Sequence, residues 1–281
     1  MPKSKISIVK YLNAVPLAWG ILEGPQKHDF DPVLSTPAEC ADQLAKGTVD
    51  IGLIPSIEYQ RIKASRIVAG PAVASLYFVK SVLLISMVPL WKVKTVACDN
   101  GSRTSVALTK IVFDEFYHIH PDFRPAEPNL SNMLAQNDAA LLIGDNALKF
   151  MEQNNLPNID NQKPIVRMGS EPLEVFDLAE RWRFLTGLPF VFAFWAVRDG
   201  VKDSSIVDRL KASRDFGVAN IPTISEKYSE SLQIKKEFIQ AYLEKNVHYY
   251  MDEACLEALR LFYEKAARVG AIKSARGLQF L

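Results

Sequence analysis

The chain has 281 residues, of which 48% are hydrophobic, and its 33 Lys and Arg residues nearly balance 32 Asp and Glu residues, giving a net charge of +1. This length exceeds that of the commonest single domain and suits two lobes with a large core. Because the basic residues are interspersed with acidic ones and form no stripe, the composition argues against a nucleic-acid-binding protein, and a charged ligand must be held by local groups.

No export signal or membrane span is visible along the chain. The first apolar segment, residues 6–9, is an expected strand and is too short for the core of an export signal. The longest apolar run, residues 190–197, is far below the roughly 20 residues that a membrane-spanning helix needs. We therefore expect a cytoplasmic protein without membrane contact.

Residues 33–54 have the pattern of a strand, a helix and a strand. Thr36, Pro37 and Glu39 are spaced as a capping box with proline at the first helical position, and Gly47 is the expected stop. The short links favour a parallel pair of strands with the helix on one face. Ligands of such sheets collect at the carboxyl ends of the strands.

A second unit begins with a strand at residues 95–98 and continues into a helix at residues 103–117, whose apolar positions recur at helical spacing. Before this helix, Gly101 permits an unusual turn and Ser102 can cap. The exposed N–H groups of a helix start, helped by the helix dipole, can bind a carboxylate or phosphate. On spacing alone, a well-capped helix without a ligand remains an equal alternative.

The rest of the chain completes two lobes. A buried strand at residues 139–143 ends at Gly144-Asp145, and residues 190–197 form a strand buried on both faces, with its aromatic side chains in the core. Amphipathic helices are expected at residues 204–214, 231–245 and 252–269, packed on the first lobe. The expected division is residues 1–86 and 191–281 in lobe one and residues 87–190 in lobe two.

Cysteine and histidine are placed as structural residues. Cys40, Cys98 and Cys255 are widely spaced and odd in number, and the four histidines make no His-Glu-x-x-His pattern. The sequence therefore predicts buried, reduced thiols, no disulfide framework and no metal site.

Five stretches have a familiar form when they are taken together. They are Tyr-Leu-Asn-Ala-Val-Pro-Leu at 11–17, Asp-Ile-Gly at 50–52 with Glu58-Tyr59, Ser-Arg-Thr-Ser at 102–105, Leu-Ile-Gly-Asp-Asn-Ala-Leu at 142–148, and Asp177-Leu178-Ala179-Glu180 followed by Thr-Gly-Leu-Pro-Phe-Val-Phe-Ala at 186–193. In this order and spacing the chain resembles the chorismate dehydratases of the futalosine route to menaquinone, from about residue 6 to about residue 200. The resemblance implies an α/β, two-lobed periplasmic-binding-protein type II-like fold with a cleft between the lobes and C-terminal helices.

The resemblance also implies a reaction and its residues. A dehydratase of this family is a lyase that removes water from chorismate to give 3-[(1-carboxyvinyl)oxy]benzoate, with no metal or organic cofactor. By this resemblance Asn13 and Ser81 flank the reacting centre, and Gly144 and Asp145 shape the cleft wall. One substrate carboxylate would be bound by four residues at the helix start: Ser102, Arg103, Thr104 and Ser105. No side chain is an obvious base, so the substrate's own enolpyruvyl carboxylate is the expected one.

Two other functions stay open at this point. A 1,4-dihydroxy-6-naphthoate synthase would share the fold, but that family typically opens with a Ser-Pro-Cys-Pro-Asn-Asp motif and carries a catalytic His in its second lobe. Residues 11–16 and the absence of His between residues 121 and 247 speak against it. A non-enzymatic solute-binding or sensing protein is the other alternative. Both a monomer and a homodimer are compatible with the sequence.

Overall fold

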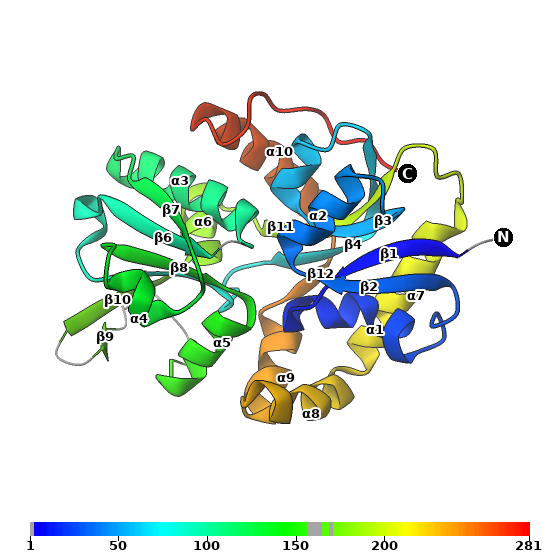
Figure 1. The fold of residues 1–281 in the computed structure, drawn as a ribbon, viewed down its shortest axis with the longest axis horizontal. Coiled ribbons are helices and arrows are strands. Elements are labelled where there is room, and N and C mark those ends of the chain that lie inside the picture. Colours follow the sequence, from blue (N-terminus) through cyan, green and yellow to red (C-terminus); the bar gives the residue numbers. More distant parts are fainter. Residues whose placement is uncertain (1–2, 100, 157–164, 169–170) are drawn as a thin grey trace.

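Two β-sheets, each surrounded by helices, form two lobes side by side (Figure 1). The structure, a computed structural model, describes residues 3–99, 101–156, 165–168 and 171–281. Within these residues each sheet has six strands. The expected α/β class with two lobes is confirmed.

The first sheet combines N-terminal strands with the long strand of residues 190–198. Its order is β12-β4-β11-β3-β1-β2, with the bounds Ser4–Val9 (β1), Phe30–Ser35 (β2), Ile51–Pro55 (β3), Ser65–Ser75 (β4), Phe190–Arg198 (β11) and His248–Tyr250 (β12). Strand β1 lies between β2 and β3 and is parallel to both, as the short links predicted. Strand β11 is antiparallel to β3 and β4 and carries the chain back into this sheet.

The helices near the first sheet start and stop where local chemistry predicts. Helix α2 (Pro37–Ala45) has the complete capping box of Thr36 and Glu39, and Gly47 beyond it has φ +69°. The other helical segments of this lobe are Val15–Glu23 (α1), Ser205–Ala219 (α7) and the 3₁₀ turns Leu12–Ala14 (η1) and Ser56–Gln60 (η2). Helix α1 packs on α7, so the N-terminal and C-terminal parts of the chain share one lobe.

The second sheet takes up a strand that the sequence had placed in lobe one. Its order is β7-β6-β8-β5-β10-β9, with the bounds Val82–Ser86 (β5), Thr95–Asp99 (β6), Asp122–Ala126 (β7), Ala139–Ile143 (β8), Ile165–Met168 (β9) and Glu171–Asp177 (β10). Because β5 pairs with β8 and β10, the chain leaves the first sheet at residues 76–81, before the expected border after residue 86. The helical segments of this lobe are Leu90–Lys92 (η3), Arg103–Tyr117 (α3), Leu130–Leu134 (α4), Gly144–Gln153 (α5) and Leu178–Thr186 (α6).

The C-terminal helices differ from the prediction in number and in contacts. The expected single helix at 231–245 is wrong, because Gln233 has φ +54° and separates helix α8 (Ile221–Leu232) from α9 (Lys236–Lys245). Helix α10 (Glu253–Arg268) contacts α3 of the second lobe as well as β11, and Lys265 pairs with Glu115. These helices therefore connect the two lobes and do not cover lobe one alone.

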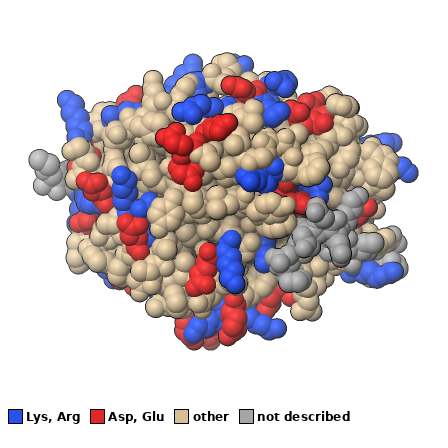
Figure 2. Space-filling model, turned by 180° about the vertical axis from the view of Figure 1, so that it is seen from behind, with Lys and Arg blue, Asp and Glu red and all other residues tan. Residues whose placement is uncertain are grey.

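The surface and the thiols agree with the composition. On the face in Figure 2, basic and acidic side chains are mixed and no large area has a single sign. Among the described residues, no helix combines the length and apolar character that crossing a membrane requires. All three cysteines are free and buried, as predicted.

The link between the sheets is held by one buried carboxylate. Asp177, which is 0% exposed, accepts hydrogen bonds from the backbone N–H groups of Val79 and Lys80 at 3.0 and 2.6 Å. Its other oxygen caps α6 by accepting from the N–H groups of Ala179 and Glu180 at 2.9 and 3.2 Å. Lys80 has φ +59°, so this acceptor also holds a backbone conformation that non-glycine residues rarely adopt.

We expect Asp177→Ala to lower the free energy of unfolding by on the order of 3 kcal/mol, because it leaves buried N–H donors without an acceptor and removes a helix cap. Asp177→Asn keeps one carbonyl acceptor and serves as the matched control with a smaller loss. Urea unfolding followed by circular dichroism measures both variants. Equal stability of Asp177→Ala and the wild type would show that the carboxylate does not hold the crossover.

Candidate functional site

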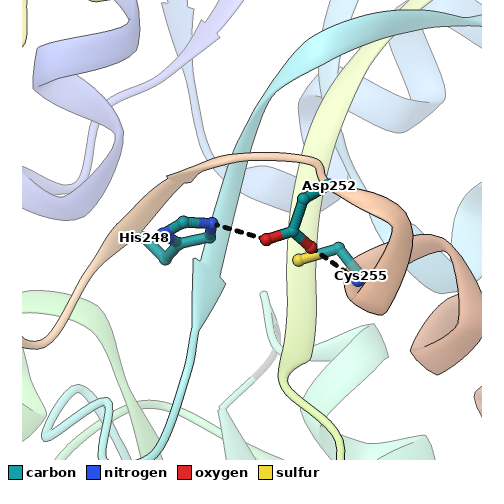
Figure 3. Close-up of side chains that lie close together, drawn as sticks. All are labelled: His248, Asp252 and Cys255. Carbon is teal, nitrogen blue, oxygen red and sulfur yellow. Dashed lines mark hydrogen bonds and ion pairs between the residues drawn. The ribbon is translucent and has the colours of Figure 1, made fainter.

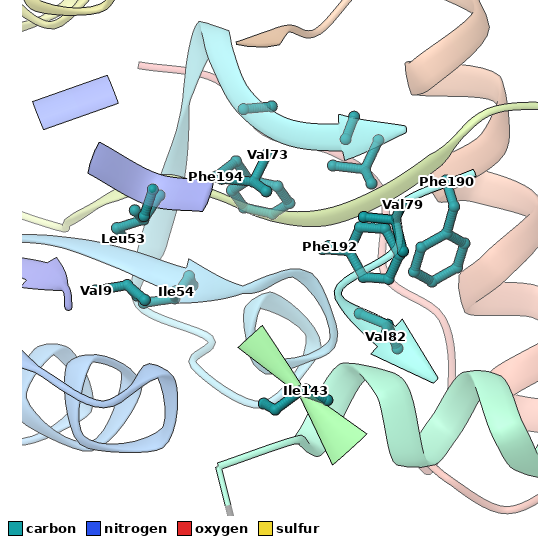
Figure 4. Packing of buried hydrophobic residues seen from close by; sticks show 14 of the residues in the cluster. Val9, Leu53, Ile54, Val73, Val79, Val82, Ile143, Phe190, Phe192 and Phe194 are labelled. Carbon is teal, nitrogen blue, oxygen red and sulfur yellow. The ribbon is translucent and has the colours of Figure 1, made fainter. Parts of the chain in front are cut away.

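A cavity lies where the carboxyl ends of strands from both lobes meet. The space between its lining residues that no protein atom fills, counted together with the adjoining open solvent, is about 520 Å³. Its apolar wall is made by Val9, Leu53, Val73, Val82, Ile143 and Phe192, and Figure 4 shows these side chains within the surrounding core. Phe192 belongs to the aromatic run that the sequence assigned to the core, so one of those rings also faces the cavity.

The polar end of the cavity is the start of α3. Gly101, Ser102, Thr104 and Ser105 line it, as the sequence suggested for an anion site. The first intrahelical hydrogen bond runs from Val106 N–H to the Ser102 carbonyl, and no described residue accepts from the N–H groups of residues 103–105. N–H donors at a helix start, together with the helix dipole, favour a negative charge at this end.

The hydroxyl groups of this turn are partly engaged. The Ser102 hydroxyl donates to the Asp99 carbonyl at 2.6 Å, so it does not cap the helix. The Thr104 hydroxyl oxygen accepts the Ile57 N–H of lobe one at 3.2 Å, which leaves its own proton to donate. Ser105 makes no side-chain bond of this kind among the described residues and lines the cavity. Thr104 and Ser105 therefore remain able to donate to a bound anion.

Arg103 points its charge at the other lobe. Its guanidinium lies 2.9 and 3.2 Å from the two Asp42 carboxylate oxygens and 3.1 Å from Glu58, and among the described residues it does not line the cavity. The Asp42 hydrogen bond raises the pKa of Arg103, so the charge is permanent. Because Asp42 and Glu58 belong to lobe one, the two ion pairs of Arg103 bridge the lobes next to the lining residues Ser102 and Thr104.

Tyr11 is a cavity residue that the sequence did not single out for a site role. Its ring lies so close to Gly144 of lobe two that a Cβ there would come 2.8 Å from the ring, and Gly144 has φ +60°. Burial, with the charges of Asp99 and Asp145, raises the pKa of Tyr11 above its usual range, so the phenol keeps its proton. Its position directly after strand β1 is the only sequence signal that could have indicated it.

Asp145 follows Gly144 and also joins the lobes. Its carboxylate accepts the Leu12 N–H of lobe one at 3.0 Å, and burial raises its pKa to about 6. The sequence-predicted residues Gly144 and Asp145 thus lie at the interlobe contact, with Gly144 in the cavity wall.

Asn13 and Ser81 are brought together although they are far apart in the chain. Asn13 lines the cavity from lobe one, and Ser81, at the end of the crossover, is fully buried next to the cavity residue Val82. The Tyr242 hydroxyl of α9 donates to Ser81 Oγ at 2.9 Å, and the Asn13 side chain lies near enough to lower the pKa of the same hydroxyl. The sequence had assigned Tyr242 to the packing face of a helix.

A group of metal-ligating type includes none of the residues that line this cavity. Among the described residues, His248, Asp252 and Cys255 place one ligand atom each within 4.8 Å of one another (Figure 3). Asp252 caps α10 through the Cys255 N–H at 2.9 Å, and its other oxygen lies 3.5 Å from His248 Nε2. Burial raises the pKa of the Cys255 thiol to about 12, so it is protonated in the metal-free protein.

The comparisons with known proteins agree with this architecture. The family described as "Menaquinone biosynthesis" matches residues 4–268. A chorismate dehydratase from Thermus thermophilus is 30% identical over 262 residues, which span 92% of this chain and 93% of that protein.

Two solved structures share the fold at low sequence identity. The AF1704 protein from Archaeoglobus fulgidus has a TM-score of 0.68 at 17% identity, over 96% of this chain and 98% of that one. The Candida albicans CA3427 gene product, described as having the generic periplasmic binding protein fold, has a TM-score of 0.64 at 11% identity, over 98% and 92%. The fold is therefore that of the periplasmic binding proteins, and the chain belongs to the menaquinone biosynthesis family.

Proposed function

We propose that this chain is a chorismate dehydratase, a hydro-lyase that converts chorismate to 3-[(1-carboxyvinyl)oxy]benzoate and water. The observation that carries the proposal is the interlobe cavity with the N–H groups of residues 103–105, which have no acceptor among the described residues, at its polar end. The 30% identity to a chorismate dehydratase across nearly the whole chain supports the same substrate.

The cavity suits a substrate with an anionic end and an apolar ring. One carboxylate binds at the start of α3, to the backbone N–H groups and to the Thr104 and Ser105 hydroxyls. None of the described residues that line the cavity is a Lys or Arg, so oriented dipoles supply the attraction. Arg103 serves this site from outside it, because its ion pairs with Asp42 and Glu58 keep lobe one over the bound anion.

The elimination removes one proton and one hydroxide from the ring. The proton on the ether-bearing carbon is vinylogous to the ring carboxylate, so its loss gives a delocalised anion, and departure of the neighbouring hydroxide makes the ring aromatic. Tyr11 is the titratable side chain among the described lining residues, and its raised pKa makes it a donor and not a base. The substrate's enolpyruvyl carboxylate therefore takes the proton, positioned by Asn13 and Ser81, while the closed cavity excludes water.

Incubation with chorismate, followed by chromatography, tests the proposal directly. The wild type should produce the aromatic product, and Asn13→Ala and Ser81→Ala should each lower kcat by about 100-fold, since each removes a preorganised hydrogen-bonding group. Bound but unchanged chorismate would identify a solute-binding or sensing protein. Full turnover by both variants would remove Asn13 and Ser81 from the mechanism.

Gly144→Ala should raise KM by roughly 10-fold or more, because the new methyl group meets the Tyr11 ring and pushes the lobes apart. Gly187→Ala is the matched control, since Gly187 has a similar φ of +72° but nothing within 4 Å of the added Cβ. Steady-state kinetics on both variants separates steric contact from backbone strain. An equal effect of the two substitutions contradicts the role of the Tyr11 contact.

The affinity for the anionic substrate should depend on the ionisation of Asp145. The pKa of Asp145 is raised to about 6, so the carboxyl group is mostly neutral at pH 5 and negative at pH 7.5. Repulsion between the two anions then raises KM by roughly 3- to 10-fold as the pH rises through this range. Asp145→Asn keeps an acceptor for the Leu12 N–H, and its KM should not rise with pH in this way. The same rise in KM in the variant would show that another group is responsible.

A further inference from the structure

Tyr242 joins residues from three distant parts of the chain through one buried hydroxyl. Its side chain on α9 is 1% exposed, and its hydroxyl donates to Ser81 Oγ at 2.9 Å across a separation of 161 residues. The Asn13 side chain, from the first turn after β1, lies near enough to this hydroxyl to lower its pKa. A buried phenol held by such a bond is fixed in orientation and fixes its partner in turn.

The direction of this hydrogen bond matters for a ligand. Since Tyr242 gives its single proton to Ser81 Oγ, the proton of the Ser81 hydroxyl must go to another acceptor. No described residue accepts it. Burial raises the pKa of Tyr242 above its usual range, so the phenol stays a donor throughout the physiological pH range.

This chain of groups lies directly behind one wall of the cavity. Asn13 lines the cavity itself, and so does Val82, the residue after Ser81. Gly144, a third lining residue, donates its N–H to the Ser81 carbonyl at 2.8 Å. The free Ser81 proton and the Asn13 amide are therefore next to the space that a ligand occupies.

We propose that Tyr242 is a positioning residue that orients the Asn13 amide and the Ser81 hydroxyl as a preorganised pair of groups facing the substrate. This inference rests on the proposed function for its kinetic consequences, because the same two groups position the reacting carboxylate there. Tyr242 itself is not among the described residues that line the cavity.

Tyr249 on β12 provides a matched control. It is 3% exposed, and its buried hydroxyl has no hydrogen-bond partner among the described residues. Removing this hydroxyl takes away no hydrogen bond, whereas removing that of Tyr242 breaks the bond to Ser81. The two substitutions to Phe otherwise delete the same atom from buried tyrosines of the same C-terminal segment.

The kinetic test compares Tyr242→Phe and Tyr249→Phe with chorismate as substrate. Tyr242→Phe should lower kcat about 10-fold or more with little change in KM, and Tyr249→Phe should stay within about 2-fold of the wild type. In a Ser81→Ala background, Tyr242→Phe should cost much less, because the hydroxyl it positions is already gone. Wild-type kinetics for Tyr242→Phe would overturn the proposal. So would a double variant whose loss in kcat equals the product of the losses in the two single variants.

Crystal structures of both variants test the positioning without turnover. The Asn13 amide and the Ser81 hydroxyl should adopt new orientations in Tyr242→Phe and keep their wild-type orientations in Tyr249→Phe. Should Tyr242→Phe fail to fold, Ser81→Ala breaks the same bond from its other end and should reorient Asn13. Unchanged orientations refute the positioning role, whereas a wild type that does not convert chorismate refutes only the proposed function.

Discussion

One buried carboxylate determines how the two lobes meet. Asp177 binds the backbone of Val79 and Lys80 in the crossover and, with its other oxygen, the start of α6. Ser81 follows Lys80 directly, so the contact that anchors the crossover also sets the place where Ser81 meets Tyr242. The stability of the second lobe, the path of the chain between the sheets and the geometry of the cavity wall therefore depend on the same four hydrogen bonds. A buried water molecule in place of the carboxylate would itself need hydrogen-bond partners, so it would not be an equivalent substitute.

The proposed anion site relies on backbone dipoles and not on a charged side chain. The nearest guanidinium, that of Arg103, is neutralised by Asp42 and Glu58, and it contributes by joining the lobes. Attraction at the start of α3 then comes from backbone N–H groups, whose directions are fixed by the helix and need no reorganisation when charge moves. Such donors gain strength as the lobes exclude water, because the local dielectric constant falls. The apolar wall, with Phe192 and Ile143, contributes to this exclusion.

The fold and the chemistry of this protein have separate origins. Solved structures at 11–17% identity share the two lobes and therefore show the fold alone. What would distinguish an enzyme from a binding protein on this frame is the set of contacts that cross the cleft. Here these contacts include the Tyr11 ring on Gly144, the Leu12 N–H on Asp145 and the Ile57 N–H on Thr104. Each joins a residue in or directly before a 3₁₀ turn of the first lobe to the first turn of a helix in the second lobe.

Local sequence signals determined much of this protein without any structure. The capping box of Thr36, the limits of α3, strand β8 and the burial of the three cysteines were all predicted, because each depends on neighbours within a few residues or on composition. Only the tertiary structure decided that β5 belongs to the second sheet, that Arg103 pairs with Asp42, and that Tyr242 bonds to Ser81. The partners in the two side-chain contacts are separated by 61 and 161 residues. An apolar strand or a helical tyrosine has the same local pattern whichever partner it meets, so the partner is chosen by how the whole chain packs.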